Sequence, residues 1–135
     1  MHTTMLTVRF GETDMAGHVN NAVFLSYLEE ARLSFMRDVL GLGEVPLILA
    51  SAKLDFLRQV RFPDLLAITT GVTRIGRSSF DMTHQVYREP DRELALTAAA
   101  TLVAFDYAAQ KTTPIPEDWR RMLNLHQVPI PQPRD

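Results

Sequence analysis

The chain of 135 residues contains no cysteine. This absence excludes disulfide bonds, cysteine-ligated zinc, iron–sulfur clusters and a cysteine nucleophile, and it is compatible with a reducing compartment. No apolar run reaches the roughly 18 residues that a membrane-spanning helix requires. The amino-terminal residues have neither a basic start nor the apolar segment of a secretory signal peptide. We therefore expect a cytoplasmic protein without membrane association.

A strong charge of one sign is also absent. The sequence has 14 Lys and Arg against 16 Asp and Glu, a formal net charge of −2. Without a basic field, nucleic acid is not expected as a partner. Hydrophobic residues make up 46% and charged residues 22% of the chain, which excludes disorder for most of it. A single domain of this size has a modest core, and oligomerisation commonly supplements such a core.

One long helix is predicted from Asn21 to about Leu40, a stretch without Pro or Gly. Asn20 suits the N-cap position, and Gly41 and Gly43 supply a stop. The apolar face is wide, which indicates a helix surrounded by protein rather than one lying on a surface. Its main stripe follows steps of three and four residues and consists of Phe24, Leu28, Ala31, Phe35, Val39 and Leu42.

Alternating or continuous apolar residues predict five strands. These strands lie at about residues 6–10, 48–56, 66–72, 80–86 and 94–105. The short turns between the later strands favour antiparallel neighbours. An α+β fold, with an antiparallel sheet of about five strands wrapped around one central helix, buries the wide helical face economically. The Pro-rich tail, at about residues 112–135, is predicted to hold a short helix near residues 117–124.

The segment between the first strand and the helix is rich in groups that can do chemistry. It contains Glu12, Asp14, His18, Asn20 and Asn21. The N-terminus of a helix offers free N–H groups and a positive dipole end, which can stabilise an oxyanion. A nearby carboxylate can act as a nucleophile or as a general base on water. These are the parts needed for acyl hydrolysis, although the same residues also suit a turn and a helix cap.

The residues Thr-Asp-Met-Ala-Gly-His-Val-Asn-Asn-Ala-Val-Phe-Leu-Ser-Tyr-Leu-Glu-Glu-Ala-Arg, at positions 13–32, resemble the signature of a known family. That family is the 4-hydroxybenzoyl-CoA thioesterase branch of the hotdog-fold superfamily. The expected element order over residues 5–107 matches the hotdog fold, as do segments 74–80 and 102–107. The resemblance implies a single hotdog domain over residues 1–135, with its core at about residues 5–107. It also implies an acyl-CoA thioesterase that releases a carboxylic acid and free coenzyme A.

The resemblance implies a role for each catalytic candidate. Asp14 corresponds to the carboxylate that attacks the thioester carbonyl or activates water. The backbone N–H of Asn21 corresponds to the oxyanion donor, and His18 and Asn20 shape and polarise the loop. No metal and no separate cofactor are implied, since coenzyme A is part of the substrate.

The resemblance also implies where the substrate binds and how the protein assembles. It places the phosphates of coenzyme A near Arg74, Arg77, Ser78 and Ser79. It places the active site between two subunits, so we expect a homodimer at minimum and a homotetramer, a dimer of dimers, in full. Phe24 stands where the family commonly has Tyr, which changes the acyl pocket. Phe62-Pro63-Asp64 replaces a common Tyr-Gly-Asp turn.

Other residues of the chain suit structural roles, and two other functions are compatible with the sequence. Glu12 is expected to be a solvated or salt-bridged turn residue, Glu29 and Glu30 to be solvated or paired on the helix, and His84 to be a core residue. An acyl-carrier-protein thioesterase and a non-catalytic domain that binds acyl-CoA both remain open. The acyl group, aromatic or aliphatic, is not indicated by the sequence.

Overall fold

A computed structural model of the chain describes residues 1–42 and 46–131. Its strands are β1 (His2–Thr7), β2 (Leu47–Phe56), β3 (Leu65–Ile75), β4 (Ser79–Glu89), β5 (Glu93–Asp106) and the short β6 (Lys111–Thr112). Its helices are α1 (Val23–Leu40) and α2 (Glu117–Leu125), and a 3₁₀ turn covers Phe10–Glu12. The predicted short helix in the tail is thereby confirmed.

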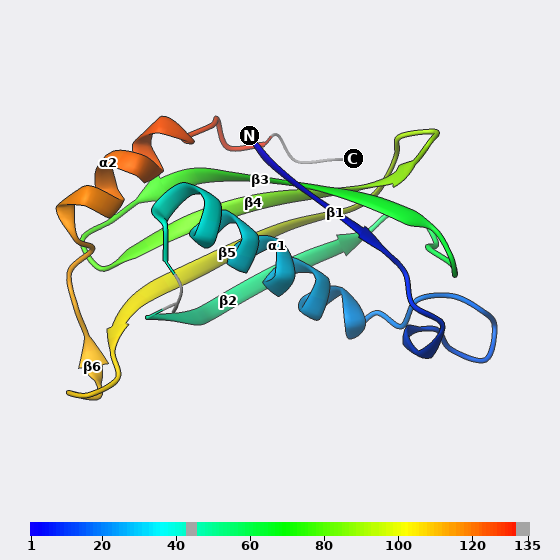
Figure 1. Cartoon of the computed structure of the whole chain (residues 1–135), viewed down its shortest axis with the longest axis horizontal. Coiled ribbons are helices and arrows are strands. Elements are labelled where there is room, and N and C mark those ends of the chain that lie inside the picture. Colours follow the sequence, from blue (N-terminus) through cyan, green and yellow to red (C-terminus); the bar gives the residue numbers. More distant parts are fainter. Residues whose placement is uncertain (43–45, 132–135) are drawn as a thin grey trace.

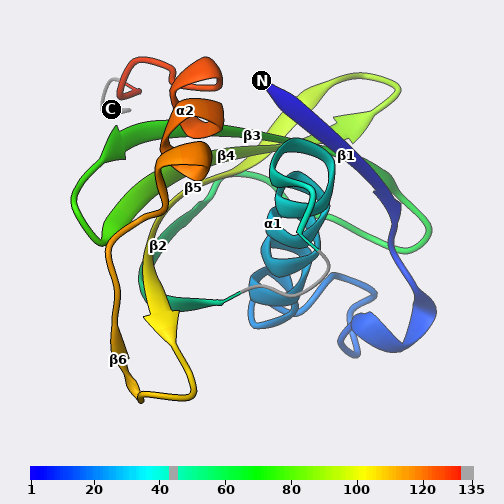
Figure 2. The same ribbon diagram turned by 60° about the vertical axis from the view of Figure 1, so that its left-hand side comes forward.

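The strands form one antiparallel sheet in the order β1-β3-β4-β5-β2, and β6 pairs with β5. β2 follows α1 along the chain but takes the edge of the sheet farthest from β1 (Figure 1). The sheet curls around α1, and α2 lies beside the end of α1 that is far from the active-site candidates (Figure 2). The predicted architecture, one antiparallel sheet wrapped around one long helix, is confirmed.

The core lies between α1 and the sheet. Along the first half of α1, Phe24, Tyr27 and Leu28 pack with residues of β3, β4 and β5. Along the second half, Phe35 and Met36 pack with a second group that includes Trp119 and Leu123 of α2. Burying a side chain of this size contributes about 1.5–3 kcal/mol. The helical periodicity read from the sequence therefore identified the buried face of α1.

The boundaries of two elements differ from the prediction. The first strand ends at Thr7, and Phe10 is 76% exposed rather than part of a strand. The chain leaves the sheet after Val8, whose N–H donates to the carbonyl of Asp64 at 2.9 Å. α1 begins at Val23, two residues later than expected, because residues 20–25 first form a tighter turn with i to i−3 hydrogen bonds. Gly41 ends the helix in the left-handed conformation, and the predicted stop at Gly43 lies outside the described residues.

β2 is an edge strand whose side chains are largely exposed. Its existence was predicted, but the alternating apolar residues of its pattern are not buried within this chain: Ile48 is 37% and Phe56 45% exposed. β2 pairs with β5 along one side only, so the backbone groups of its other side are unpaired among the described residues. An apolar strand with an open edge is a surface that proteins normally cover.

His84 of β4 is fully buried beneath α1, as expected for a core residue. Its Nδ1 lies 3.1 Å from the hydroxyl of Thr70 on the neighbouring strand. Burial, together with the nearby positive charge of Arg32, lowers the pKa of His84 to about 3, so the ring is neutral. This histidine is therefore part of the packing of the sheet against the helix.

No helix in the described part of the chain is long and apolar enough to cross a membrane.

Candidate active site at the N-terminus of the central helix

The segment between β1 and α1 folds into a small hairpin. At its base the N–H of Asn20 donates to the carbonyl of Glu12 at 3.2 Å. Nearer the tip, the N–H of Asp14 donates to the carbonyl of His18 at 2.7 Å, and the N–H of Gly17 donates to the carbonyl of Asp14 at 3.0 Å. Gly17 has a φ of +80°, a conformation that residues with a Cβ rarely adopt. The sequence predicted a loop here. The hairpin seen in the structure determines which side chains and N–H groups of this loop face the solvent.

The carboxylate of Asp14 is oriented by the hairpin. Its Oδ1 accepts hydrogen bonds from the N–H of Ala16 at 2.9 Å and from the N–H of His18 at 3.1 Å. For Oδ2, no hydrogen-bond partner is found in residues 1–42 and 46–131. Asp14 is exposed. One oxygen thus fixes the side chain while the other is available to water or to a substrate, so the turn role and a chemical role are compatible.

Asn20 and Asn21 lie where the hairpin enters the helix. The side-chain Oδ1 of Asn20 accepts the N–H of Ala22 at 2.9 Å, and its carbonyl accepts the N–H of Val23 at 2.9 Å. Asn20 therefore caps the tight turn that leads into α1, whereas the N-cap of α1 itself is Ala22, two residues later than predicted. Within the described residues, the N–H of Asn21 has no hydrogen-bond partner. This N–H lies in the tight turn just before α1, near the positive end of the helix dipole, so it is able to donate to an anion.

His18 and Phe24 were also predicted for the site. His18 is half-buried and pairs through its backbone with Arg61, and its buried Nε2 has no partner among the described residues. Phe24 is 3% exposed and contacts Tyr27 and Phe56 edge to face, with ring centroids 5.5 and 5.8 Å apart. Phe24 is therefore a core residue within one chain, next to an aromatic ring that is partly open to solvent.

Glu12 lies at the base of the hairpin and is bound from three directions. Its Oε1 accepts the N–H of Arg9 and the hydroxyl of Tyr27, each at 2.8 Å, and its Oε2 accepts the guanidinium of Arg9 at 3.2 Å. Burial alone raises the pKa of Glu12, but the hydrogen bonds from Arg9 and Tyr27 outweigh it and lower the pKa. Glu30 of α1 also pairs with Arg9, at 3.5 Å. The salt-bridged role expected of Glu12 is confirmed, and the paired role open to Glu30 is realised with Arg9.

Tyr27 was not singled out as a site residue by sequence reasoning. It is 1% exposed, on the buried face of α1. Burial raises the pKa of Tyr27, and the hydrogen bond to Glu12 raises it further, so the hydroxyl stays protonated and donates. The two residues are 15 positions apart and belong to different elements. No sequence pattern joins them, so this contact could be found only in the folded chain.

The four residues predicted near the phosphates of coenzyme A lie at the opposite end of the molecule. The turn between β3 and β4 carries Arg77, Ser78 and Ser79, while the Asp14 hairpin lies at the other end of α1 (Figure 1). The guanidinium of Arg74 is bound by Asp81 at 2.8 Å and by the hydroxyl of Ser79 at 3.0 Å, whereas Arg77 is exposed. The hydrogen bond from Arg74 lowers the pKa of Asp81. One chain therefore does not bring the catalytic and phosphate-binding candidates together.

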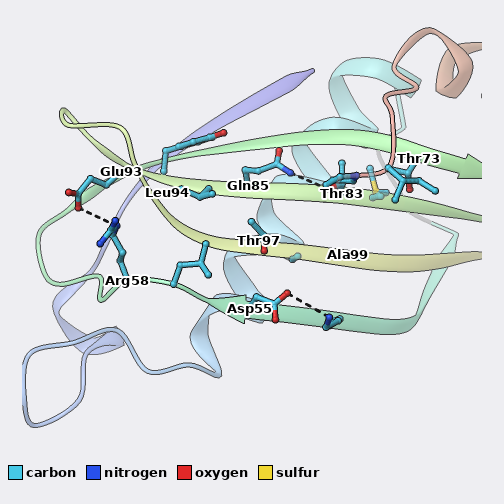
Figure 3. Close-up of a pocket in the computed structure, with 16 residues that line it drawn as sticks. Asp55, Arg58, Thr73, Thr83, Gln85, Glu93, Leu94, Thr97 and Ala99 are labelled. Atoms are coloured by element: carbon cyan, nitrogen blue, oxygen red, sulfur yellow. Dashed lines mark hydrogen bonds and ion pairs between the residues drawn. The ribbon is translucent and has the colours of Figure 1, made fainter. Parts of the chain in front are cut away.

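A hollow in the described part of the chain lies away from the Asp14 hairpin. It has a volume of about 940 Å³ and lies over β4, β5 and β2, where Thr83, Gln85 and Thr97 face away from α1 (Figure 3). Its charged side chains are engaged in ion pairs, Arg58 with Glu93 among them. Among residues 1–42 and 46–131, no cluster of three or more His, Asp or Glu is placed to hold a metal ion. The hairpin therefore remains the candidate site for acyl chemistry.

Comparisons with known proteins identify the family of the chain. A family model described as a thioesterase-like superfamily matches residues 8–123. The long-chain acyl-CoA thioesterase FadM of Escherichia coli is 26% identical over 125 residues, 89% of this chain and 95% of that protein. The 1,4-dihydroxy-2-naphthoyl-CoA hydrolase of Rippkaea orientalis is 30% identical over 129 residues, 87% of this chain and 91% of that protein.

Solved structures extend the comparison to the fold. The crystal structure of a thioesterase from Thermus thermophilus, complexed with coenzyme A and Zn, is 32% identical to this chain. It superposes with a TM-score of 0.82, and the match covers 93% of each chain. The chain therefore belongs to the thioesterase-like superfamily, and it is a thioester hydrolase of the hotdog fold.

Proposed function

We propose that the protein hydrolyses acyl-CoA thioesters at the hairpin before α1, with Asp14 as the reacting carboxylate. The observation that carries this proposal is the arrangement of Asp14 and Asn21. One carboxylate oxygen of Asp14 is fixed by two backbone N–H groups. Among the described residues the other oxygen has no partner, and neither has the N–H of Asn21, which lies in the tight turn just before α1. The similarity to FadM and to a naphthoyl-CoA hydrolase supports coenzyme A as the carrier.

The chemistry follows from these two groups. In one route Asp14 attacks the thioester carbon, expels the thiolate of coenzyme A and forms an anhydride that water then hydrolyses. In the other, Asp14 takes a proton from a water molecule that attacks the same carbon. In both routes the carbonyl oxygen becomes an oxyanion, which the N–H of Asn21 stabilises. The products are a carboxylic acid and free coenzyme A.

A homodimer joined through β2 accounts for the positions of the phosphate-binding candidates. β3 has 11 residues, so its ends are about 35 Å apart at roughly 3.3 Å per residue. A twofold axis beside the open edge of β2 would bring the Arg77 turn of one subunit to the same end as the Asp14 hairpin of the other. The same pairing would cover the exposed apolar residues of β2. A dimer of these dimers gives the expected homotetramer.

A panel of thioesters tests the proposed function. We expect the purified protein to release free thiol from acyl-CoA substrates, measured as initial rates on short to long aliphatic chains and on benzoyl and phenylacetyl groups. The preferred acyl group then defines the pocket beside Phe24. The same acyl groups on acyl carrier protein are the comparison. Faster release from the protein carrier would contradict the choice of coenzyme A, and tight acyl-CoA binding without turnover would contradict hydrolysis.

The positive φ of Gly17 gives a matched pair of variants. Gly17→Ala and Gly41→Ala each place a Cβ on a residue with a φ between +67° and +80°, and neither Cβ meets another atom within 4 Å. Each is expected to destabilise the fold by about 1–2 kcal/mol, measured by urea unfolding. Only Gly17→Ala should also lower kcat, because its strain distorts the hairpin that orients Asp14. Equal kcat values for the two variants would show that the conformation of the hairpin does not affect the reaction.

A further inference from the structure

We infer that Tyr27 and Glu12 form a positioning device that holds the Asp14 hairpin against the central helix. This inference rests on the proposed function, because it assigns to Tyr27 a role in the reaction at Asp14. Neither side chain is a catalytic residue in it. Their hydroxyl and carboxylate act through the backbone of the hairpin, and the juxtaposition that carries the inference is the 2.8 Å hydrogen bond from Tyr27 to Glu12.

The geometry begins in the core. Tyr27 packs among buried side chains between α1 and the sheet, so its ring has a fixed position. Its hydroxyl is directed out of this core toward the hairpin, where it meets Oε1 of Glu12. A hydroxyl on a rigid, buried ring has a fixed position. The exposed residues of the hairpin tip have no comparable packing to hold them in place. Through this hydrogen bond, Glu12 holds the hairpin at a fixed position relative to the core.

Glu12 connects to both ends of the hairpin. Its side chain also accepts the N–H of Arg9, where the chain leaves the first strand. Its own carbonyl accepts the N–H of Asn20, the residue that caps the turn leading into α1. Asp14 follows Glu12 by two residues and is joined back to His18. The separation between the Asp14 carboxylate and the N–H of Asn21, just before α1, thus depends on Glu12.

Catalysis is sensitive to this separation. A reacting carboxylate and an oxyanion donor must both reach one thioester carbonyl, and a displacement of about 1 Å can cost roughly a hundredfold in rate. Tyr27→Phe keeps the buried ring and removes only the hydroxyl. We expect it to lower kcat about tenfold and to leave KM within about twofold, since coenzyme A binding does not depend on the hairpin base.

Tyr107→Phe is the matched control. The hydroxyl of Tyr107 donates to the carbonyl of Leu47 at 2.8 Å, so this variant also loses one hydrogen bond from a tyrosine. It lies after β5, away from the hairpin. Tyr27 is 1% and Tyr107 53% exposed, so Tyr27→Phe is expected to lose more stability in urea unfolding, but both variants should stay folded. Only Tyr27→Phe should lose kcat. A kcat for Tyr27→Phe equal to that of Tyr107→Phe would overturn the inference.

Variants of Glu12 separate positioning from proton transfer. The amide oxygen of Glu12→Gln can still accept from Arg9 and Tyr27, whereas Glu12→Ala removes both contacts. We expect Glu12→Gln to stay within a few-fold of the wild-type kcat and Glu12→Ala to fall about a hundredfold. The acid limb of the pH–rate profile should be the same in wild type and Glu12→Gln. If Glu12→Gln is as inactive as Glu12→Ala, Glu12 acts through its charge or proton and the inference is wrong.

Amide hydrogen exchange tests the device without turnover. The N–H groups of Ala16, His18 and Asn20 close the hairpin, and they should exchange faster in Tyr27→Phe but not in Tyr107→Phe. Unchanged exchange at all three would contradict the inference. If the wild-type protein hydrolysed no acyl-CoA, the proposed function would fail, and the exchange rates would still decide whether Tyr27 orders the hairpin.

Discussion

Asp14→Ala is expected to lower kcat for acyl-CoA hydrolysis by at least about 10²–10³-fold, the loss typical when one group that stabilises the transition state is removed. Both routes open to this site, attack on the thioester and activation of water, need the carboxylate. The remaining N–H of Asn21 could still polarise the carbonyl, so a small residual rate is expected. Free-thiol release on the best substrate of the panel measures the effect.

Asp14→Asn separates the chemistry of Asp14 from its role in the loop. An asparagine keeps an oxygen at the position of Oδ1, which can accept the N–H groups of Ala16 and His18. The hairpin should therefore remain intact, with circular dichroism and unfolding close to wild type. Its kcat should nevertheless fall as far as that of Asp14→Ala. If Asp14→Asn retained most of the activity, Asp14 would be only a turn residue and another group would carry the reaction.

Labelled water distinguishes the two routes. In a single turnover in water enriched in oxygen-18, attack by Asp14 forms an anhydride, and cleavage of this anhydride by water at the Asp14 carbonyl places the label in the Asp14 carboxylate. Label in Asp14 therefore identifies this route, whereas cleavage at the acyl carbonyl puts the label in the acid. Activation of water instead places all the label in the released acid. Mass spectrometry of the peptide that contains Asp14 reads the result. Repeated turnover strengthens the signal, and Asp14→Asn serves as the unlabelled control.

Much of the fold follows from local sequence patterns. The helical stripe through Phe24, Leu28 and Phe35 predicted the buried face of α1, because that periodicity is a property of the helix itself. The 3₁₀ turn at Phe10 was missed because Phe10 continues the apolar alternation of the first strand. Its ring instead packs against Phe62, at 5.7 Å, outside the sheet. The alternation of β2 correctly indicated a strand, but the pattern did not reveal that its apolar side chains are largely exposed in one chain.

The candidate site is predictable where its residues are neighbours in the chain. Asp14, His18, Asn20 and Asn21 fall within one short segment, so their proximity follows from sequence alone. The contact of Tyr27 with Glu12 depends on how α1 lies against the hairpin, which is a tertiary property. Arg74 illustrates the same limit. Its pairing with Asp81 requires the register of β3 on β4, whereas the family resemblance implied a phosphate ligand.

Introducing a charge on the open edge of the sheet is expected to separate the subunits and abolish activity together. Leu49 of β2 is 40% exposed and lines a hollow of about 200 Å³ with Arg32 and Leu33 of α1. In a dimer joined through β2, Leu49→Glu would place two buried carboxylates near the twofold axis, where each carries a desolvation cost. In a monomer the same carboxylate lies in solvent beside Arg32. Leu49→Glu should therefore be a folded monomer.

Light scattering after size exclusion gives the mass of each variant, and thiol release gives its kcat. Leu125→Glu is the matched control, since Leu125 is 73% exposed at the end of α2 and away from β2. It should keep the wild-type mass and rate. We expect Leu49→Glu to lose activity at least about a hundredfold, because the Asp14 hairpin and the Arg77 turn of one chain lie at opposite ends. A monomeric wild-type protein with full activity would contradict the shared site.

Mixing two inactive variants tests the shared site directly. Asp14→Ala and Arg77→Glu each damage both sites of a homodimer. In a mixed dimer, one site combines both defects, while the other takes Asp14 from one subunit and Arg77 from the other and is intact. Random exchange of subunits should therefore restore about one quarter of the wild-type rate. If Asp14 and Arg77 served the same site from one chain, exchange would restore nothing, because every site would keep one defect.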